Sequence, residues 1–402
     1  MGSHLAPKDA VKKKFWVSDM ETVAFITMLL VVIGTINVFS ASFVKAEMDF
    51  GSPYFFLIRQ GIILVVAFFC CILGIRVDYH KWRNLMPFVL GITFVALITV
   101  LIAGVEVNGA KRWLPLPIVQ LQPAEVAKLV SVMLISSYLA FRLKQGESVN
   151  IFNRQFGFIA AMGILIELEP DAGTMGIVVG VPILLMLTSG LGWRKCAAVL
   201  AAGVVAFAGL LYVQPYRMAR FMVLYDPWAD AQNIGYQTVR SLSAIGSGGF
   251  SGMGLGLGVS KYDYLPEAHT DFAFAVWSQE TGFLGVALVI LLYALFVIYG
   301  LRIALSARDL YGEILAAGIV YLIGAQAAIN LLMVAGILPV IGVPLPFISY
   351  GGTSLVITLA AVGILLNIGY DGVAGQQERM RKKVMETPPT LYLIKNERKG
   401  TA

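Results

Sequence analysis

Residues 261–272 gather ionisable side chains at the edge of a hydrophobic stretch. The segment contains Asp263, Glu267, His269 and Asp271, and an apolar run begins at 272. Ionisable groups at a membrane boundary cost desolvation free energy unless they are paired or hydrated, so such a cluster is a functional-site hypothesis. A carboxylate there can take a proton from an attacking hydroxyl, which makes Asp271 the catalytic candidate. The structural alternative is that Asp271 caps the helix that follows.

The composition places this cluster in a membrane protein. Of the 402 residues, 58% are hydrophobic and 13% are charged, and the mean hydropathy is +0.79. A bilayer core of roughly 30 Å needs about 20 apolar residues per helix. We therefore expect an all-α polytopic membrane protein with about ten transmembrane helices and a long extracytoplasmic loop between helices 7 and 8. The expected spans are 20–44, 54–75, 84–104, 123–141, 155–168, 172–191, 196–213, 272–300, 312–334 and 353–370, of which 155–168 and 172–191 could instead form one bent helix.

Basic residues in the short loops set the expected orientation, because Lys and Arg accumulate on the cytoplasmic side. Both tails are basic, and alternate loops around 76–83, 142–154, 194–195 and 302–308 carry Lys and Arg. We expect a cytoplasmic tail at 1–19, a membrane domain at 20–370, an extracytoplasmic loop at 214–271 that carries the active site, and a cytoplasmic tail at 371–402. Residues 1–4 resemble the remnant of an expression tag. The basic tails indicate contact with anionic lipid rather than nucleic acid.

A second group of charges lies at the outer start of the fourth expected span. Glu125 and Lys128 are three residues apart there, so on a helix they share a face and can form an ion pair. A charged Lys inside a span faces the protein interior or a wet cavity rather than lipid. Two interpretations stay open: the pair locks the helix, or Lys128 approaches and orients an acid such as Asp271.

Two outer loops place cations beside aromatic residues. Lys111 and Arg112 precede Trp113, and Arg217 and Arg220 lie in a second aromatic-containing segment. Anchoring at the interface explains the aromatic residues, whereas guanidinium groups also suit bidentate binding of phosphate. If their segment is helical, Arg217 and Arg220 could together clamp a pyrophosphate.

Residues 338–354, between the last two expected spans, contain three prolines and three glycines. This composition forbids a continuous helix, so the backbone must be buried in protein or face a cavity. Such segments often line binding sites, and Ser349 is the candidate contact here, with a rigid re-entrant plug as the alternative. In the turn at 169–174, Asp171 is placed to cap the next helix; contact with substrate is its second interpretation.

The remaining motifs limit the function classes. The glycine-rich run at 246–258 follows no predicted strand, which excludes a dinucleotide-binding loop. It forms either a flexible interfacial loop or a place where backbone approaches a lipid or glycan closely. The three cysteines fall in expected spans and indicate apolar packing rather than disulfides. The three histidines have no metal-ligand spacing, so the ligands of any metal stay unknown.

These motifs, in this order, resemble the SEDS family, which comprises FtsW, RodA and sporulation homologues. The resemblance covers roughly 20–370, and the amino-acid sequence at 256–261 and 264–271 is more similar to FtsW than to RodA. Two segments, 239–241 and 278–282, depart from the sequence that is usual in the family. The resemblance rests on Asn108 to Trp113, Gln122 to Glu125 with Lys128, Pro170-Asp171 with Gly173-Thr174, Pro215 to Arg217 with Arg220, Asp226 to Trp228, Gly246 to Gly249, Leu265 to Phe272 and Pro344 to Ser354.

The resemblance implies a peptidoglycan glycosyltransferase that polymerises lipid II at the outer face of the bacterial cytoplasmic membrane. It also implies that Asp271 is catalytic, that a divalent cation such as Mg or Mn assists, and that the partners are a class B penicillin-binding transpeptidase and division-complex regulators. The FtsW-like sequence favours a role in septal cell division, with a RodA-type role in elongation as the alternative. The residues expected to bind the substrate and its pyrophosphate are Lys111, Arg112, Arg217, Arg220, Lys261, Glu267, His269 and Ser349.

Two other function classes fit the same sequence. A lipid II flippase would also use ten spans, an intramembrane Lys and broken helices, but it needs no general base. A non-enzymatic scaffold for division proteins would tolerate the loss of Asp271. The fate of lipid II polymerisation when Asp271 is replaced distinguishes these classes.

Overall fold

The computed structural model describes residues 18–107, 110–115, 120–213, 215–262 and 265–386. Twelve helices and three short strands form within these residues. In chain order they are α1 (Asp19–Phe50), α2 (Phe55–Arg76), α3 (Tyr79–Ala103), β1 (Val105–Val107), β2 (Ala110–Pro115), β3 (Gln120–Leu121), α4 (Pro123–Lys144), α5 (Arg154–Leu168), α6 (Ala172–Thr188), α7 (Trp193–Val213), α8 (Pro215–Met222), α9 (Tyr236–Gly248), α10 (Ala273–Leu305), α11 (Leu310–Val334) and α12 (Gly352–Glu386).

Every expected span coincides with one of these helices, namely α1 to α7 and α10 to α12. Among the described residues, seven helices are long and apolar enough to cross a membrane: α1 to α4, α10, α11 and the 352–375 part of α12. Helix α6 is apolar but shorter. The all-α polytopic class is therefore confirmed, whereas the number ten stays a prediction. Helices α5 and α6 are separate elements, joined by a turn at 169–171.

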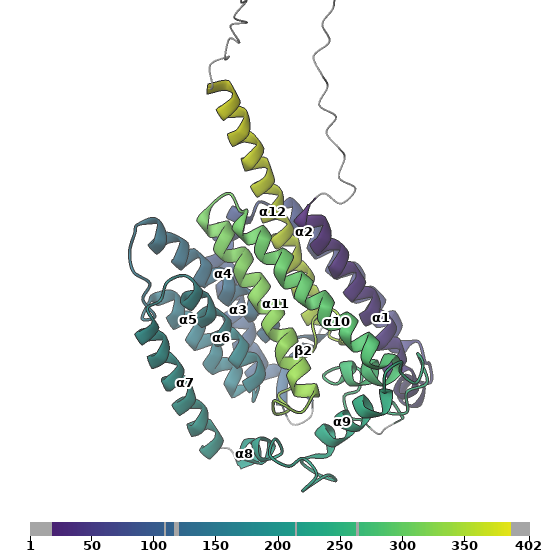
Figure 1. The fold of residues 1–402 in the computed structure, drawn as a ribbon. Helices are drawn as coiled ribbons and strands as arrows, with labels where there is room; N and C mark the ends of the chain where they lie inside the picture. The colour runs from purple at the N-terminus through teal and green to yellow at the C-terminus, as the bar shows by residue number, and fades with distance from the viewer. Residues whose placement is uncertain (1–17, 108–109, 116–119, 214, 263–264, 387–402) are drawn as a thin grey trace, which may run out of the picture.

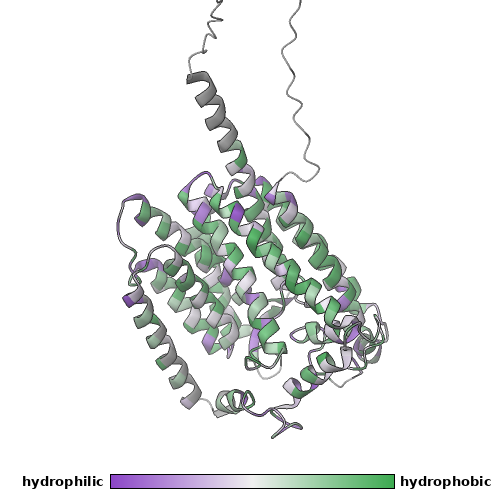
Figure 2. Cartoon of the chain, in the orientation of Figure 1, coloured by the Kyte–Doolittle hydropathy of each residue, from purple (hydrophilic) through white to green (hydrophobic). Residues whose placement is uncertain are grey.

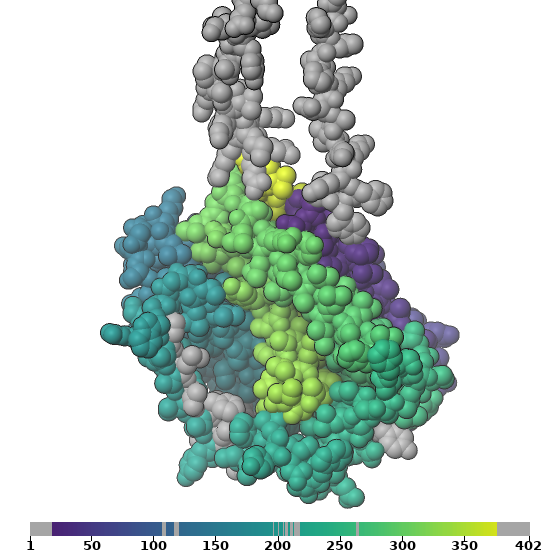
Figure 3. Space-filling model, in the orientation of Figure 1, coloured from purple at the N-terminus to yellow at the C-terminus, as the bar shows by residue number. Residues whose placement is uncertain are grey.

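The helices stand side by side in one bundle, and hydrophobic residues cover most of their length (Figures 1 and 2). The start of α1 and the end of α12 lie at one end of the bundle, which we call the tail end (Figure 1). The sheet, α8 and α9 lie at the opposite end, which we call the loop end. Helix α7 stands away from the bundle and α8 leads back toward it. The surface is hollowed between the α5 to α7 side and α11 (Figure 3).

Local signals in the sequence explain where the helices begin and how closely they pack. Short polar side chains accept hydrogen bonds from backbone amides at five N-termini, which satisfies donors that a helix leaves unpaired. Gly363 allows α2 and α12 to approach closely, because it has no side chain. A Cβ at this position would lie only 2.2 Å from the carbonyl oxygen of Cys71. The capping residues are Ser18, Asp78, Asn153, Asp171 and Asp309.

A small antiparallel sheet, in the order β1-β2-β3, interrupts the otherwise helical fold at the loop end. Its register pairs Val105 with Trp113 and Glu106 with Lys111, and Leu114 with Leu121. The sequence prediction contained no strand here. The sheet matters for the site because β2 carries Arg112.

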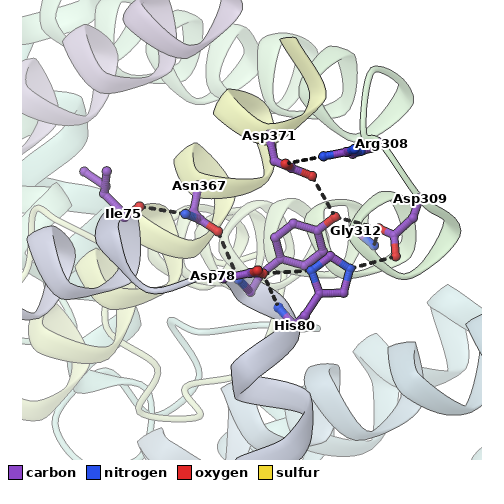
Figure 4. Close-up of polar contacts among 9 residues, drawn as sticks. Ile75, Asp78, His80, Arg308, Asp309, Gly312, Asn367 and Asp371 are labelled. Carbon is purple, nitrogen blue, oxygen red and sulfur yellow. Dashed lines mark hydrogen bonds and ion pairs between the residues drawn. The ribbon is translucent and has the colours of Figure 1, made fainter. Parts of the chain in front are cut away.

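A polar cluster at the tail end joins three segments that are distant in sequence (Figure 4). The Tyr79 hydroxyl donates to Asp309 at 2.7 Å and lies 3.4 Å from an oxygen of Asp371. The ring nitrogens of His80 lie 2.7 Å from Asp78 and 3.1 Å from Asp309. These contacts hold the start of α3, the turn before α11 and α12 together.

Candidate active site

Asp271 lies directly before α10 at the loop end and is partly buried. The N-cap of α10 is Phe272, which makes no side-chain capping bond, so the helix-capping alternative does not describe Asp271. Its backbone carbonyl accepts a 2.8 Å hydrogen bond from Nδ2 of Asn330. Asn330, fully buried on α11, also donates to the carbonyl of Val343 at 2.7 Å. Helix α11 thereby fixes Asp271 against the broken segment at 335–351.

The Asp271 side chain faces a small space beside Gly342. A Cβ built on Gly342 would lie 3.5 Å from Oδ2 of Asp271 and 3.8 Å from Nη1 of Arg112, so a carboxylate and a guanidinium flank the same space. Gly342 has φ +71, a left-handed conformation that favours glycine. Among the described residues, nothing donates a hydrogen bond to this carboxylate, which leaves it available to a ligand.

The surroundings of Asp271 raise its pKa to about 7. Burial is the largest cause, since it disfavours the charged form, and the negative charges of Glu267 and Asp171 act in the same direction. Arg112 and Arg220 oppose the shift but do not cancel it. Near neutral pH the group therefore exists in both protonation states, as a general base working at that pH requires.

Arg112 connects the sheet to the turn between α5 and α6. Its Nε donates to the Glu169 carbonyl at 3.2 Å, and Nη2 donates to the carbonyl of Pro170. Asp171 caps α6 by accepting from the Thr174 amide at 3.1 Å, which is the structural role considered for it. Burial raises the pKa of Asp171, against the opposing effect of Arg112.

Glu169 is a member of this site that sequence reasoning missed. Glu169 is 1% exposed, and neither of its carboxyl oxygens has a hydrogen-bond partner among the described residues. Burial and the neighbouring Asp171 raise its pKa to about 8, while Arg112 lowers it. Its environment therefore favours the protonated form of Glu169 at neutral pH. The acid next to Pro170-Asp171 was visible in the sequence, but its burial was not.

The other expected phosphate-binding cations lie in different settings. Residues 215–222 are helical, as the spacing of Arg217 and Arg220 requires for a clamp. Arg220 is exposed, and its Nη1 donates to the Val340 carbonyl at 3.0 Å, so it reaches the broken segment. The Arg217 side chain lies outside the described residues. Lys111 is exposed on β2 opposite Glu106, and no described contact joins it to Asp271.

Lys128 is buried and paired within its own helix. Its Nζ lies 2.8 Å from Glu125 and donates to Gln326 at 2.7 Å. Gln326 in turn donates to the Pro344 carbonyl at 3.0 Å. No described contact joins Lys128 to Asp271 directly. These bonds hold Pro344 next to Val343, whose carbonyl accepts from the same Asn330 amide that bonds the Asp271 carbonyl.

The remaining predicted site residues have protein partners. The buried Ser349 hydroxyl accepts from the Leu345 amide at 2.9 Å. The His269 ring packs against both Phe56 and Tyr350, and burial lowers its pKa to about 4, so it is neutral at pH 7. Glu267 accepts from the Thr270 hydroxyl at 2.6 Å. Lys261 is buried in a separate ion pair, described below, and Asp263 lies outside the described residues.

A metal ion held by the protein alone needs several ligating side chains close together. No cluster of three or more His, Cys, Asp or Glu side chains suited to a metal ion occurs in the described part of the chain. Mg²⁺, however, is often held by one or two carboxylates together with substrate phosphates. Asp271 and Asp171 fit that second pattern and do not form a dedicated site.

Comparisons with known proteins cover nearly the whole chain. The family profile described as "Cell cycle protein", which covers FtsW, RodA and SpoVE, matches residues 20–372. "Stage V sporulation protein E" of Bacillus subtilis (strain 168) is 40% identical over 85% of this chain and 94% of that protein. "Probable peptidoglycan glycosyltransferase FtsW" of Geobacter sp. (strain M18) is 37% identical over 86% of this chain and 95% of that protein.

Solved structures are similar over the same range. A chain from "Structural coordination of polymerization and crosslinking by a peptidoglycan synthase complex" superposes with a TM-score of 0.72 at 26% identity, covering 89% of this chain and 99% of that chain. The rod shape determining protein RodA of Thermus thermophilus gives 0.63 at 27% identity, over 87% of this chain and 96% of that chain.

Proposed function

We propose, because this chain belongs to the FtsW, RodA and SpoVE family of cell cycle proteins, that it is a peptidoglycan glycosyltransferase with Asp271 as its base. Relatives at 37% and 38% identity carry the name "Probable peptidoglycan glycosyltransferase FtsW". The observation that supports the role of Asp271 is its carboxylate, which has no hydrogen-bond donor among the described residues, faces Arg112 beside Gly342 and has a pKa of about 7.

The reaction joins an acceptor sugar to a lipid-linked donor. The acceptor hydroxyl oxygen attacks the anomeric carbon of the donor sugar, and Asp271 takes the hydroxyl proton. The bond between that carbon and the phosphate oxygen breaks, and the lipid diphosphate leaves with the electron pair. Direct displacement inverts the anomeric centre. A base whose pKa lies near the working pH accepts the proton efficiently yet is ionised often enough to act.

The departing diphosphate needs positive charge close to Asp271. Arg112 is the best-placed cation, because its Nη1 faces the Gly342 space while its other nitrogens hold the carbonyls at 169 and 170. Arg220 reaches the same broken segment.

A divalent cation is part of the proposal as a companion of the substrate. Mg²⁺ or Mn²⁺ would neutralise diphosphate charge, with substrate phosphates supplying most of its ligands. Asp271 or Asp171 would supply the protein's share. The proton transfer assigned to Asp271 does not depend on this cation.

The family also supports a proposal for the substrate, the side of the membrane and the partners. We propose that lipid II is the substrate, that both tails are cytoplasmic, and that Asp271 works at the outer face of the cytoplasmic membrane beside a class B penicillin-binding transpeptidase and division regulators. The FtsW-named relatives support a role in septal division. A sporulation role is the second candidate, favoured by the 40% identity to stage V sporulation protein E.

Incubation of the purified protein and its transpeptidase with lipid II tests this function. Gel analysis should show glycan strands that disappear with Asp271→Asn, while binding of the transpeptidase stays unchanged. Transbilayer movement of lipid II in vesicles without any polymer would instead identify a flippase. Normal cell division with Asp271→Ala, together with no polymer from the wild type, would identify a scaffold.

A further inference from the structure

A second buried ion pair lies outside the contacts of the Asp271 site. Nζ of Lys261 is 3.0 Å from Oε1 of Glu280, with side-chain exposures of 0% and 1%. Ser40 of α1 donates to both oxygens of Glu280 at 2.7 Å. Breaking such a pair is strongly destabilising, whereas replacing both partners with apolar residues is often neutral. Stability alone therefore gives a weak reason for burying two charges here.

The pair closes a loop that contains the catalytic acid. Lys261 precedes Asp271 by ten residues and Glu280 follows it by nine. Two further bonds run beside the pair: the Ser260 amide donates to Gln279 at 3.0 Å, and the Gly258 amide donates to Glu280 at 3.3 Å. The two stems of the loop are therefore joined away from water.

The glycine-rich run wraps around the same place on α10. Helix α10 is interrupted at Gly282, with φ 64 and ψ -161. Backbone bonds join Met253 to Gln279 and Gly254 to Glu280, both at 3.0 Å. A Cβ on Gly252 would lie 2.1 Å from the Glu280 carbonyl oxygen. The close backbone approach expected for these glycines is thus made to α10 itself.

Other elements hold the middle of the loop through its backbone. Asn37 of α1 donates to the Ala273 carbonyl at 2.8 Å, and the Tyr350 amide donates to the His269 carbonyl at 2.9 Å. The Asp271 carboxylate has no hydrogen bond from another described residue to orient it. Its direction therefore depends on how firmly the backbone on both sides is held.

We propose that Lys261 and Glu280, with Ser40, are positioning residues that hold the Asp271 loop in its reactive geometry; this rests on the function proposed above. The pair, named here the Lys261–Glu280 clasp, touches no reacting atom. It fixes the loop stems so that the carboxylate stays beside Gly342 and Arg112. Misplacement of a reacting group by about 1 Å can cost about a hundredfold in rate.

The double variant Lys261→Met with Glu280→Met tests the proposal, because it removes both charges and leaves neither buried alone. We expect an unfolding temperature close to wild type, kcat for lipid II polymerisation at least tenfold lower, and KM within about twofold. Lys261→Ala alone leaves Glu280 buried without its cation, so this variant should lose both activity and stability. The control is Arg142→Met with Glu147→Met, which removes an ion pair at the tail end and should leave kcat unchanged.

Hydrogen exchange provides a readout that does not need turnover. Amides at 265–273 should exchange at least tenfold faster in the double variant, with no change in α4 or α11. Wild-type kcat, or unchanged protection at 265–273, would overturn the clasp. An inactive wild-type protein would instead refute the proposed function, while the exchange result would still decide the clasp.

Discussion

The raised pKa of Asp271 predicts a specific pH dependence of activity. An ordinary Asp has a pKa of about 3.9, whereas burial and neighbouring negative charges raise that of Asp271 to about 7. The difference of about three units corresponds to about 4 kcal/mol, an upper value because the side chain is partly exposed. About a tenth of the molecules then carry the carboxylate at pH 6 and about nine tenths at pH 8. The value of kcat/KM should rise about tenfold between these two pH values.

Glu267→Gln perturbs this pKa with little change in shape. Glu267 is the neighbouring charge that raises the Asp271 pKa most, and a Gln oxygen can still accept the Thr270 hydrogen bond. Removing the charge should lower the Asp271 pKa by about half a unit to one unit. Activity at pH 6, relative to its plateau, should therefore increase about three- to fivefold.

The assay is kcat/KM for lipid II polymerisation between pH 5 and 9, since this ratio reports the ionisation of the free enzyme. Glu47→Gln, which removes an exposed acid at the same end of the molecule, serves as the control and should leave the profile unchanged. A wild-type profile that is flat from pH 5 to 8 would refute the raised pKa. A Glu267→Gln profile displaced toward higher pH would refute the electrostatic reasoning.

Three further variants probe the surroundings of the site and the tail end. Lys128→Ala leaves Glu125 buried without its cation, so it should lower stability by about 3–5 kcal/mol and lower activity more than loss of an exposed Lys; wild-type turnover would contradict its role in holding the broken segment. Gly342→Ala places a methyl group 3.5 Å from Asp271 in a left-handed conformation, at a cost of about 1–2 kcal/mol, and should reduce kcat well beyond what its thermal unfolding explains. Asp309→Asn should destabilise the protein by about 1 kcal/mol, a value reduced by solvent screening. Burial raises the Asp309 pKa, but bonds from Tyr79, an amide and His80 outweigh it and lower the pKa, so this stability is present above about pH 4 and lost as pH falls further. An unfolding temperature difference that grew on acidification would contradict the sign.

Helix positions followed from the sequence because bilayer thickness and apolar length determine them. All ten expected spans fall on helices, with ends that differ by a few residues except for α12, which continues to Glu386. The strands between α3 and α4 were missed, since β1 and β3 have only three and two residues and too few positions to show an alternating pattern. The interruption of α10 at Gly282 was also missed, because the apolar residues on both sides of the polar stretch 278–282 predict a single span.

The site was predictable where a single residue carries the signal. Asp271 stood out as an acid at a membrane edge, and Arg112 and Arg220 as cations in outer loops. Pairing across the fold was not predictable. The pairing of Lys261 with Glu280 could not be read from the sequence, because Glu280 lies nineteen residues away on a helix expected to be continuous. Burial of Glu169 likewise depends on packing that no local pattern encodes.

The most direct test of the account is lipid II polymerisation by Asp271→Asn, measured with the transpeptidase bound and at saturating substrate. Asn keeps the size of the side chain but cannot accept the acceptor's proton, so kcat should fall by about 10²–10⁴-fold while the protein folds and binds its partner normally. Polymerisation at the wild-type rate would show that Asp271 is not the base, and the mechanism described here would be wrong.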